Sequence, residues 1–518
     1  MAVLAFLPSS LSTGQRVGVL GAASIVCYVL YCLVAGVYHL YFSPVRKFPG
    51  PKLWVVFPIL RWTALLQGTL ERHLLDFHIK YGNVVRIGPS ELSFNDAQAW
   101  QDIYGFGHPE LPKAVAFHEP DGKPDHLIHA NSADHTRYRK IMAGGFSEKA
   151  IRKQEPLIKV YVDSLMEQLR ILGRQGDRVD LAKWLHLVTF DLIGDLSFGE
   201  PFGGVSSAQE HDYIRTMFLF VKAGAYLSFF YNYPILGKLA SFLTPKSLAE
   251  AHSRQWQFSE QVTMRRIRNK GQQGRGDFMD SMVESRGTPN GMSDQEILVN
   301  ASVLISAGAE TSATTLSGTL YYLLRHPDKL AHAQHEVRSV FSDESEITFI
   351  TSSSKLPYMV ACITEAMRIY PPLPSTLPRF TPPGAPTMIS GHVVPPNVIV
   401  GVNQLAAYWD PRNFYAADKY LPERWLRDHY SQANSPFHYD KRDALQPFSV
   451  GPRNCIGRNL AYAETRTIMA RLLYNFDFEL CEESRDWADQ KIVFWWDKKP
   501  MLCVIRNRDS QELWKREA

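Results

Sequence analysis

One cysteine near the C-terminus lies in a loop that is suited to hold a sulfur ligand. Cys455 belongs to the segment Phe448-Ser-Val-Gly-Pro-Arg-Asn-Cys-Ile-Gly457, which fits the pattern F-x-x-G-x-R-x-C-x-G. Gly451 and Gly457 let the backbone fold tightly around the sulfur with N–H groups turned toward it, and Arg453 adds a cation. In a chain of this composition the pattern has a chance probability on the order of 10⁻⁴. The loop therefore predicts a metal-ligating thiolate, of the kind that haem iron takes.

The residues after Cys455 predict a helix that begins beside the sulfur. This helix should run to about Tyr474, with Ala461, Ala463 and Leu472 among its small and apolar positions. A helix N-terminus is positive, so it should lower the pKa of the thiol and favour the thiolate. The alternative for an isolated cysteine is a small buried hydrophobe.

A second pattern lies about 145 residues earlier, in a long predicted helix. Ser293 and Glu296 form a capping box, and no proline interrupts residues 294–325, which would span about 48 Å as a helix. At the middle stands Ala307-Gly-Ala-Glu310-Thr311, where small residues make room beside an acid and an alcohol. Such a pair can relay the protons that dioxygen needs to lose one oxygen atom as water. The alternative is a surface glutamate beside a threonine bonded to its own helix.

With these two motifs the chain resembles the cytochrome P-450 family of haem-thiolate monooxygenases, whose signature loop it matches at every fixed position. The resemblance covers nearly the whole chain. It implies a mainly α fold with a small β region, with Cys455 as the axial ligand of the iron in haem b (heme b, iron protoporphyrin IX). It also implies that Glu310 and Thr311 are the catalytic proton-delivering pair.

The resemblance further implies which residues contact the haem propionates. The segment His135-Thr-Arg-Tyr-Arg139 is similar to the family's W-x-x-x-R helix, with His135 where tryptophan is usual. Arg379 stands where the family often places another propionate donor, and Arg453 completes the set. The expected cofactor-binding residues are therefore Cys455, Arg453, Arg139, Arg379, His135, Phe448, Gly451 and Gly457.

A structural triad is also implied. Glu365 and Arg368 lie three residues apart on one helical face, where they can pair. Two other segments of the chain fit E-x-x-R, but only this one precedes Tyr370-Pro-Pro at the family's distance from the cysteine. Arg424 supplies the second cation. Breaking such a buried pair from one side costs about 3–5 kcal/mol, so these residues are expected to be structural.

Composition limits the alternatives. The 518 residues carry a net charge of +4 and no basic run with interleaved aromatics, so nucleic acid is not an expected partner. The six cysteines include no C-x-x-C pair and suggest no disulfide framework, which favours a reducing compartment. His126, His129 and His135 lack the accompanying ligand spacing of a zinc site. No linker or repeat divides the chain, so one large domain after an anchor is expected.

The N-terminus predicts a membrane anchor. Residues 17–37 contain no charge and are long enough to cross about 30 Å of hydrocarbon, whereas a cleaved signal peptide should have a shorter apolar region. Arg46, Lys47 and Lys52 follow the span and only Arg16 precedes it, so the catalytic domain is expected in the cytoplasm and the single-pass anchor in the endoplasmic reticulum. The expected divisions are a lumenal N-terminus (1–16), anchor and exit (17–42), proline-rich hinge (43–53) and haem domain (54–518).

The expected reaction is hydroxylation or epoxidation of an apolar substrate with O₂. Segments 103–130, 215–230, 300–311, 373–379 and 494–498 are expected to line an apolar pocket. The resemblance implies electrons from NADPH through a diflavin reductase, or from a cytochrome b-type donor. Basic residues expected to receive the partner are Arg137, Lys140, Lys441, Arg442 and Arg458.

The segments Phe190–Gly199 and Asp102–Gly105 resemble filamentous-fungal members of secondary metabolism, such as the isotrichodermin hydroxylase group. This resemblance implies a terpenoid, polyketide or alkaloid pathway, including mycotoxin biosynthesis. Two alternatives stay open: a haem-thiolate isomerase or dehydratase that uses no O₂, and a haem sensor without turnover. Such proteins have no need of the Glu310–Thr311 pair.

Overall fold

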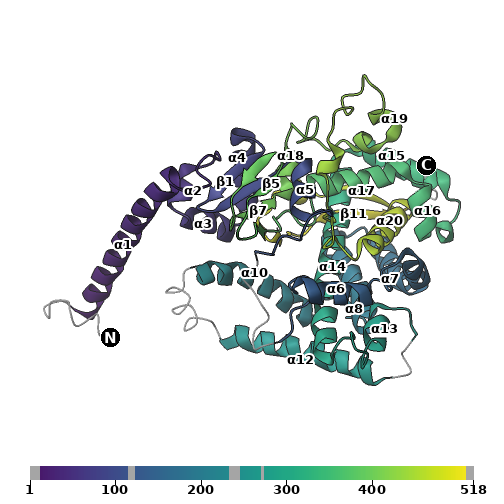
Figure 1. Cartoon of the computed structure of the whole chain (residues 1–518). Helices are drawn as coiled ribbons and strands as arrows, with labels where there is room; N and C mark the ends of the chain where they lie inside the picture. The colour runs from purple at the N-terminus through teal and green to yellow at the C-terminus, as the bar shows by residue number, and fades with distance from the viewer. Residues whose placement is uncertain (1–11, 115–122, 233–245, 270–273, 509–518) are drawn as a thin grey trace.

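Helix α14 (Asp294–Arg325) runs through the middle of the helical part of the molecule (Figure 1). The computed structural model describes residues 12–114, 123–232, 246–269 and 274–508. The Ser293 hydroxyl accepts from the Glu296 N–H and the Glu296 carboxylate accepts from the Ser293 N–H, so the predicted capping box and the predicted bounds of this helix are confirmed. Most of its residues are buried, which requires neighbours on nearly every side.

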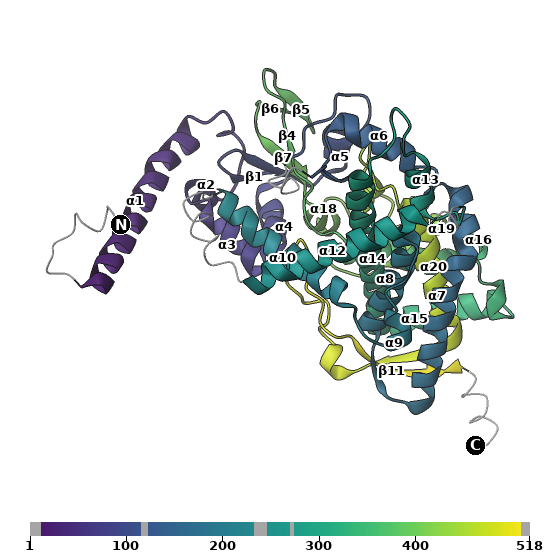
Figure 2. The same ribbon diagram turned by 90° about the horizontal axis from the view of Figure 1, so that it is seen from below.

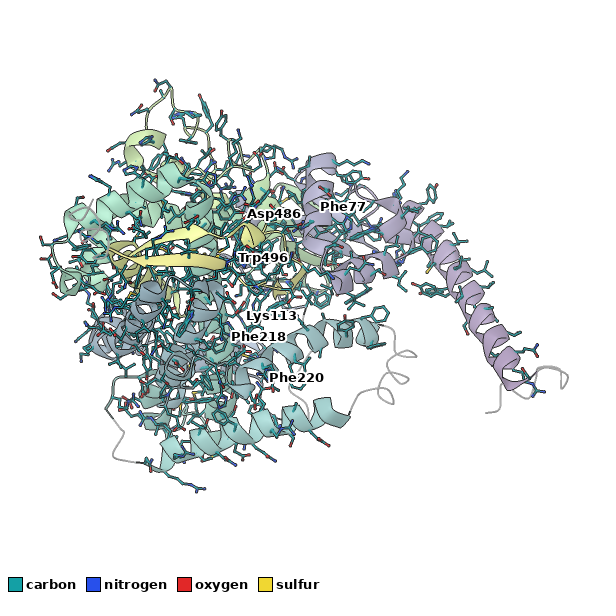
Figure 3. The ribbon with its side chains drawn as sticks, turned by 180° about the vertical axis from the view of Figure 1, so that it is seen from behind. Phe77, Lys113, Phe218, Phe220, Asp486 and Trp496 are labelled. Carbon is teal, nitrogen blue, oxygen red and sulfur yellow. The ribbon has the colours of Figure 1, made fainter. Side chains whose placement is uncertain are left out.

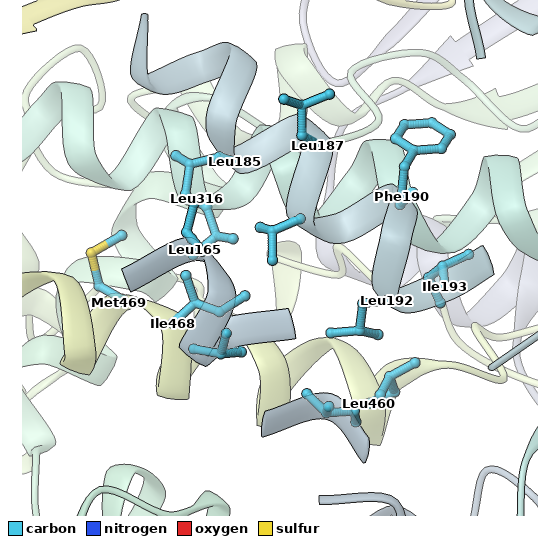
Figure 4. Packing of buried hydrophobic residues seen from close by; sticks show 14 of the residues in the cluster. Leu165, Leu185, Leu187, Phe190, Leu192, Ile193, Leu316, Leu460, Ile468 and Met469 are labelled. Carbon is cyan, nitrogen blue, oxygen red and sulfur yellow. The ribbon is translucent and has the colours of Figure 1, made fainter. Parts of the chain in front are cut away.

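Three helices supply those neighbours: α8 (Leu181–Phe198), α17 (Pro357–Ile369) and α20 (Arg458–Asn475). Two glycines of α14 allow the approach. A Cβ on Gly308 would lie 2.8 Å from Cδ1 of Ile193, and a Cβ on Gly318 would lie 2.7 Å from Cδ1 of Tyr370. Leucine, isoleucine and phenylalanine side chains of α8, α14 and α20 meet in the main core (Figure 4). The helix predicted after Cys455 is α20, and it ends within one residue of the expected position.

The remaining helices pack around this centre. They are α2 (Lys52–Val56), α3 (Ile59–Gln67), α4 (Leu70–Tyr81), α5 (Ala97–Tyr104), α6 (Ser132–Met142), α7 (Glu148–Gln175), α9 (Gly204–Ser207), α10 (Asp212–Asn232), α12 (Lys246–Arg268), α13 (Phe278–Glu284), α15 (Pro327–Val340), α16 (Phe349–Ser354), α18 (Gln404–Trp409) and α19 (Arg427–Tyr430). Short 3₁₀ turns are η4 (Glu344–Glu346), η5 (Pro422–Trp425), η6 (Arg442–Ala444) and η7 (Glu482–Ser484).

The strands form small sheets, as the expected mainly α fold with a small β region requires. The largest has the order β1-β2-β7-β4, with β2 and β7 parallel and the other pairs antiparallel. A three-stranded sheet has the order β3-β11-β8, and two hairpins pair β5 with β6 and β9 with β10. The strands are β1 (Val84–Gly88), β2 (Glu91–Phe94), β3 (Arg178–Asp180), β4 (Arg379–Phe380), β5 (Thr387–Ile389), β6 (His392–Val394), β7 (Ile399–Val402), β8 (Phe476–Leu480), β9 (Ile492–Val493), β10 (Trp495–Trp496) and β11 (Leu502–Asn507).

Helix α1 (Thr13–Tyr41) extends away from the rest of the molecule (Figures 1 and 2). Its segment Gly14–Tyr41 has a mean hydropathy of 2.3 over its most apolar window, of which only 6% is buried, so it is long and apolar enough to cross a membrane. The guanidinium of Arg86 on β1 donates to the carbonyl of His39, at 2.8 Å, and so ties the end of α1 to the sheet. The helix begins before residue 17, and residues 1–11 of the expected lumenal segment lie outside the described residues.

The close approach of α14 to α17 predicts a position-specific cost for one added methyl group. Gly318→Ala is expected to lower the free energy of unfolding by about 1–3 kcal/mol, because the methyl meets the Tyr370 ring. Gly224→Ala in α10 is the control, since nothing lies within 4 Å of its Cβ, and it should gain about 0.5–1 kcal/mol from helix propensity. Urea unfolding of the two variants measures the difference, and equal stabilities would contradict this packing.

Candidate active site

The loop that carries Cys455 is fixed on three sides. The Cys455 N–H donates to the carbonyl of Phe448 at 2.8 Å, which closes the loop on itself. Gly451 has a φ of +77°, and a Cβ there would lie 1.7 Å from the carbonyl oxygen of Tyr104, so only glycine fits. Arg139 on α6 donates to the Asn454 carbonyl at 2.5 Å and also to its side-chain oxygen. The cysteine is therefore presented by a rigid loop just before α20.

The prediction that the helix end lowers the pKa of the Cys455 thiol is wrong in its net direction. Cys455 keeps accessible surface, while the protein atoms around its thiol remove much of the water that would solvate a thiolate. Burial raises the pKa of the Cys455 thiol, and the Gly457 N–H, Arg139 and Arg458 oppose this without outweighing it. A bound metal ion deprotonates a coordinating thiol by its own charge, so the site suits a metal ligand better than a free thiolate.

Cationic side chains gather next to this loop. Arg453 donates to Glu110 at 2.6 Å and to the Ala130 carbonyl at 2.8 Å. The buried His135 has its pKa lowered to about 3 by burial and by the charges of Arg453, Arg139, Lys113 and Arg379. The four predicted propionate contacts therefore do lie together.

Lys113 is a member of this cluster that the sequence did not reveal. Burial and the charges of Arg379 and Arg453 lower its pKa to about 7, while Glu110 acts in the opposite direction. Lys113 is labelled in Figure 3, and its backbone pairs with that of Arg379 in an isolated bridge. No motif marks it, because a single lysine in an irregular segment has no pattern.

The cationic cluster fits a doubly anionic cofactor. Among the described residues, Glu110 is the acid that pairs with Arg453 and acts on Lys113 and Arg379, and burial also lowers the pKa values of Arg139 and Arg379. Buried cations that repel one another are stabilised by added anions, and the two propionates of haem b supply two. Together with Cys455, the residues present therefore fit this cofactor.

On α14 the acid and the alcohol have different surroundings. Thr311 donates to the Ala307 carbonyl at 2.7 Å, one turn earlier, and both residues keep accessible surface on the same face of the helix. Glu310 is fully buried. Successive helix residues point about 100° apart, so the two side chains do not meet each other directly.

Glu310 is held by residues from other elements. Lys498 forms an ion pair with its Oε1, and the Thr314 hydroxyl lies 3.3 Å from the same atom. His186 on α8 places Nδ1 3.5 Å from Oε2. Burial acts to raise the pKa of Glu310, but Lys498 and His186 outweigh it, so the pKa is lowered and the carboxylate is favoured. The sequence did not indicate Lys498 or His186 as partners.

A second buried acid links α14 to α20. The Ser312 hydroxyl donates to Oε1 of Glu464, and both residues are buried. Burial raises the pKa of Glu464 to about 8, opposed only by this hydrogen bond, so the carboxyl is neutral at pH 7. Glu464 lies in the helix predicted after Cys455, but its type alone gave no sign of a buried role.

The expected structural triad is assembled as predicted. Arg368 donates to both oxygens of Glu365, at 2.9 and 2.8 Å, and Arg424 donates to Glu365 at 3.1 Å. All three are fully buried. Arg424 also pairs with Asp440, and Trp425 donates to Glu365 at 2.8 Å. The network connects α17 with η5 and with the segment that precedes the cysteine loop.

A cavity of about 370 Å³ lies beside Glu310. Three of the five expected pocket segments contribute to it, through Phe218 and Lys222, Glu310, and residues 495–498. The start of α8 and Glu210 also contribute, which was not expected. The lining carries several charges, so this cavity is not the apolar pocket predicted. Segments 103–130 and 373–379 do not line it, and residues 115–122 lie outside the described part of the chain.

Comparison with known proteins gives a consistent result. The family model described as Cytochrome P450 matches residues 48–504. Trichothecene C-4 hydroxylase of Trichoderma arundinaceum is 44% identical over 472 residues, covering 91% of this chain and 94% of the relative. Cytochrome P450 monooxygenase olcB of Penicillium canescens is 43% identical, covering 93% and 97%. Averantin hydroxylase of Dothistroma septosporum is 40% identical, covering 95% and 92%.

The neutral Glu464 predicts a pH-dependent stability. The folded carboxyl keeps its proton up to about pH 8, while the unfolded one releases it near pH 4.5. The contribution of Glu464 to the free energy of unfolding therefore falls as pH rises between these values, by at most about 5 kcal/mol. Glu464→Gln should remove this fall. Urea unfolding at pH 5, 6.5 and 8 measures it, with the exposed Glu284→Gln as control. Parallel pH profiles for wild type and Glu464→Gln would contradict a neutral buried carboxyl.

Proposed function

Because the chain belongs to the cytochrome P450 family, we propose that it inserts one oxygen atom from O₂ into an apolar fungal secondary metabolite. The chain is a haem-thiolate monooxygenase with haem b as cofactor and NADPH as the indirect electron source. The names of its relatives include hydroxylases of trichothecenes and of averantin. The supported substrate class is therefore a terpenoid, polyketide or alkaloid, hydroxylated or epoxidised.

The observation that carries the site assignment is the rigid presentation of Cys455 beside the cationic cluster. Cys455 is the proposed axial ligand, and Arg139, Arg379, Arg453 and Lys113 are the proposed partners of the propionates. When bound, the haem supplies the oxygen-activating chemistry. The closed hydrogen bond from Cys455 to Phe448 and the contact of Gly451 with Tyr104 keep the sulfur in one position.

On the other side of the site, we propose that residues of α14 deliver protons. Thr311 carries an accessible hydroxyl at the middle of the helix, and Glu310 is a buried carboxylate with charged partners. The carboxylate can hold a proton on Oε2 and the hydroxyl can pass one on at Oγ1. An isomerase or a sensor consumes no protons in oxygen reduction, so the retained pair supports the monooxygenase reading.

The electron donor is proposed to be an acidic diflavin reductase, with a cytochrome b-type protein as a second donor. Lys140, Lys441 and Arg458 are exposed, and Arg442 is half-buried over the Tyr430 ring. Such charges steer an acidic partner and depend on ionic strength. Arg137 is engaged instead by Glu296 and by the Gly291 carbonyl at 2.8 Å, so it is removed from the proposed docking set.

The proposed location is the endoplasmic reticulum membrane, with α1 as a single-pass anchor and the catalytic domain in the cytoplasm. The exposed apolar surface of α1 supports an anchor, and Arg46, Lys47 and Lys52 after it support this orientation.

Loss of the Thr311 hydroxyl is expected to uncouple electron consumption from oxygen insertion. In Thr311→Ala, hydrogen peroxide released per NADPH oxidised should rise several-fold, because the hydroxyl no longer passes on a proton. Thr319→Ala is the matched control, since Thr319 makes the same backbone bond, to Thr315 at 2.7 Å, two turns along α14. The full-length enzyme with a reductase serves for the assay. Equal peroxide ratios in the two variants would remove Thr311 from the relay.

Removal of residues 2–42 is expected to shift most of the protein from the membrane fraction to the supernatant, because the apolar helix is lost. Fractionation of yeast microsomes measures the shift. A matched variant in which Arg46, Lys47 and Lys52 become glutamine should stay membrane-bound. Full retention of the truncated chain after a high-salt wash would contradict α1 as the principal anchor.

A further inference from the structure

His186 lies between two acids that belong to different elements. Its Nδ1 is 3.5 Å from Oε2 of Glu310, and its Nε2 is 3.3 Å from Oε1 of Glu210. The ring packs against Phe190 and Phe218, with centroid distances of 4.5 and 5.3 Å. These two aromatic rings limit the orientations of the imidazole. It therefore keeps one nitrogen toward each carboxylate.

The same histidine connects the buried acid with solvent. The Glu310 side chain has no exposed surface, His186 is 13% exposed and Glu210 is 33% exposed. All three line the cavity of about 370 Å³ described above, together with Phe218 and Trp496, which Figure 3 labels. Accessibility thus increases stepwise from the centre of α14 to the surface.

Two polar atoms along this line are short of partners. Oε2 of Glu310 and Nε2 of His186 are buried and make no hydrogen bond of good geometry within the described part of the chain. Their charged neighbours lie at 3.5 and 3.3 Å, just beyond the usual hydrogen-bond range. A small side-chain shift completes either contact, and a cavity water can hydrogen-bond to either atom from the cavity side.

We propose that His186 donates the proton that reprotonates Glu310. Water in the adjoining cavity supplies His186 with protons from solvent. This inference rests on the proposed function, since it extends the proton path assigned to Glu310 and Thr311. His186 is a positioning residue in this scheme, because it acts through Glu310 and not on substrate or cofactor.

The surrounding charges favour the imidazolium form. Burial lowers the pKa of His186, but Glu210 and Glu310 outweigh it, so the pKa is raised above its ordinary value. Lys498 opposes them from the C-terminal segment. An imidazolium releases a proton near neutral pH, whereas an alkylammonium retains it to about pH 10, so the histidine is the better donor of the two residue types. The other charged residues that line the cavity are Asp180, Lys183, Lys222, Asp497 and Lys499.

The proton balance is simple. The Nδ1–H bond of the imidazolium breaks and an O–H bond forms at Oε2 of Glu310, which leaves a neutral imidazole and a neutral carboxyl. A water then carries this proton from Glu310 toward the Thr311 hydroxyl, because the two side chains do not meet directly. A proton from solvent, passed along by a cavity water, returns to Nδ1, and Glu210 stabilises the regenerated imidazolium through Nε2. No oxidant or reductant takes part in these steps.

A spectroscopic titration tests the ionisation without turnover. Nitrogen-15 NMR of the full chain, with histidine labelled, should show one imidazole signal that is lost in His186→Gln and titrates above pH 6.5. In Glu210→Gln the same signal should titrate at lower pH, because one of the two carboxylates is gone. A signal that is insensitive to Glu210→Gln would overturn the proposal.

Turnover gives the second test. The full-length enzyme with a reductase and NADPH should lose about ten- to a hundredfold in NADPH oxidation in His186→Gln, with a solvent deuterium isotope effect at least about twofold larger than in wild type. The control is His211→Gln, a half-buried histidine near the start of α10 that caps the Tyr213 N–H. If the wild type oxidises NADPH and the His186→Gln and His211→Gln variants do so at equal rates, the relay alone is overturned. A wild type that oxidises no NADPH overturns the proposed function and the relay with it.

Discussion

The burial of α14 is the constraint on which the rest of the structure depends. A helix of 32 residues that crosses the domain leaves many polar side chains without water, so they bond to their own helix, as Thr315 and Thr319 do, or to another element. Glu296 receives Arg137 and the Tyr138 hydroxyl, Ser312 meets Glu464, and Tyr321 donates to the Arg485 carbonyl. These contacts fix the rotation of the helix about its axis. That rotation places Thr311 and Glu310 in their different surroundings.

The second constraint is electrostatic. Four cations that are partly or fully withdrawn from water, with Glu110 as their acidic neighbour in the described part of the chain, are costly unless further anions balance them. The fold holds them in place through bonds such as Arg453 to Glu110 and Arg139 to Asn454. The cluster lies against the same loop that presents Cys455. One cofactor with two carboxylates and a metal would satisfy both the cations and the thiol, which explains why the family loop combines an arginine with a cysteine.

Features encoded in short segments could be predicted from the sequence, and features that join distant segments could not. The bounds of α14 followed from its capping box and lack of proline, and the pairing of Glu365 with Arg368 followed from a spacing of three. Lys498 lies 188 residues from Glu310, and Glu296 lies 159 from Arg137, so their pairing left no local signal. The charged cavity beside Glu310 joins residues from distant segments, such as Lys183 and Glu210, and was not predicted for the same reason. The upward shift of the Cys455 pKa was not predicted, because the positive helix end was considered and the desolvation of the thiol was not.

Carbon monoxide binding to the reduced protein tests the central claim, that Cys455 ligates haem iron in an oxygen-activating site. The wild type should give the shifted Soret band of a thiolate-ligated haem. Cys455→Ala should lose that band, while Cys362→Ala, which changes a buried free cysteine outside the loop, should keep it. An unchanged thiolate band in Cys455→Ala would contradict the assignment, and with it the function built on this site.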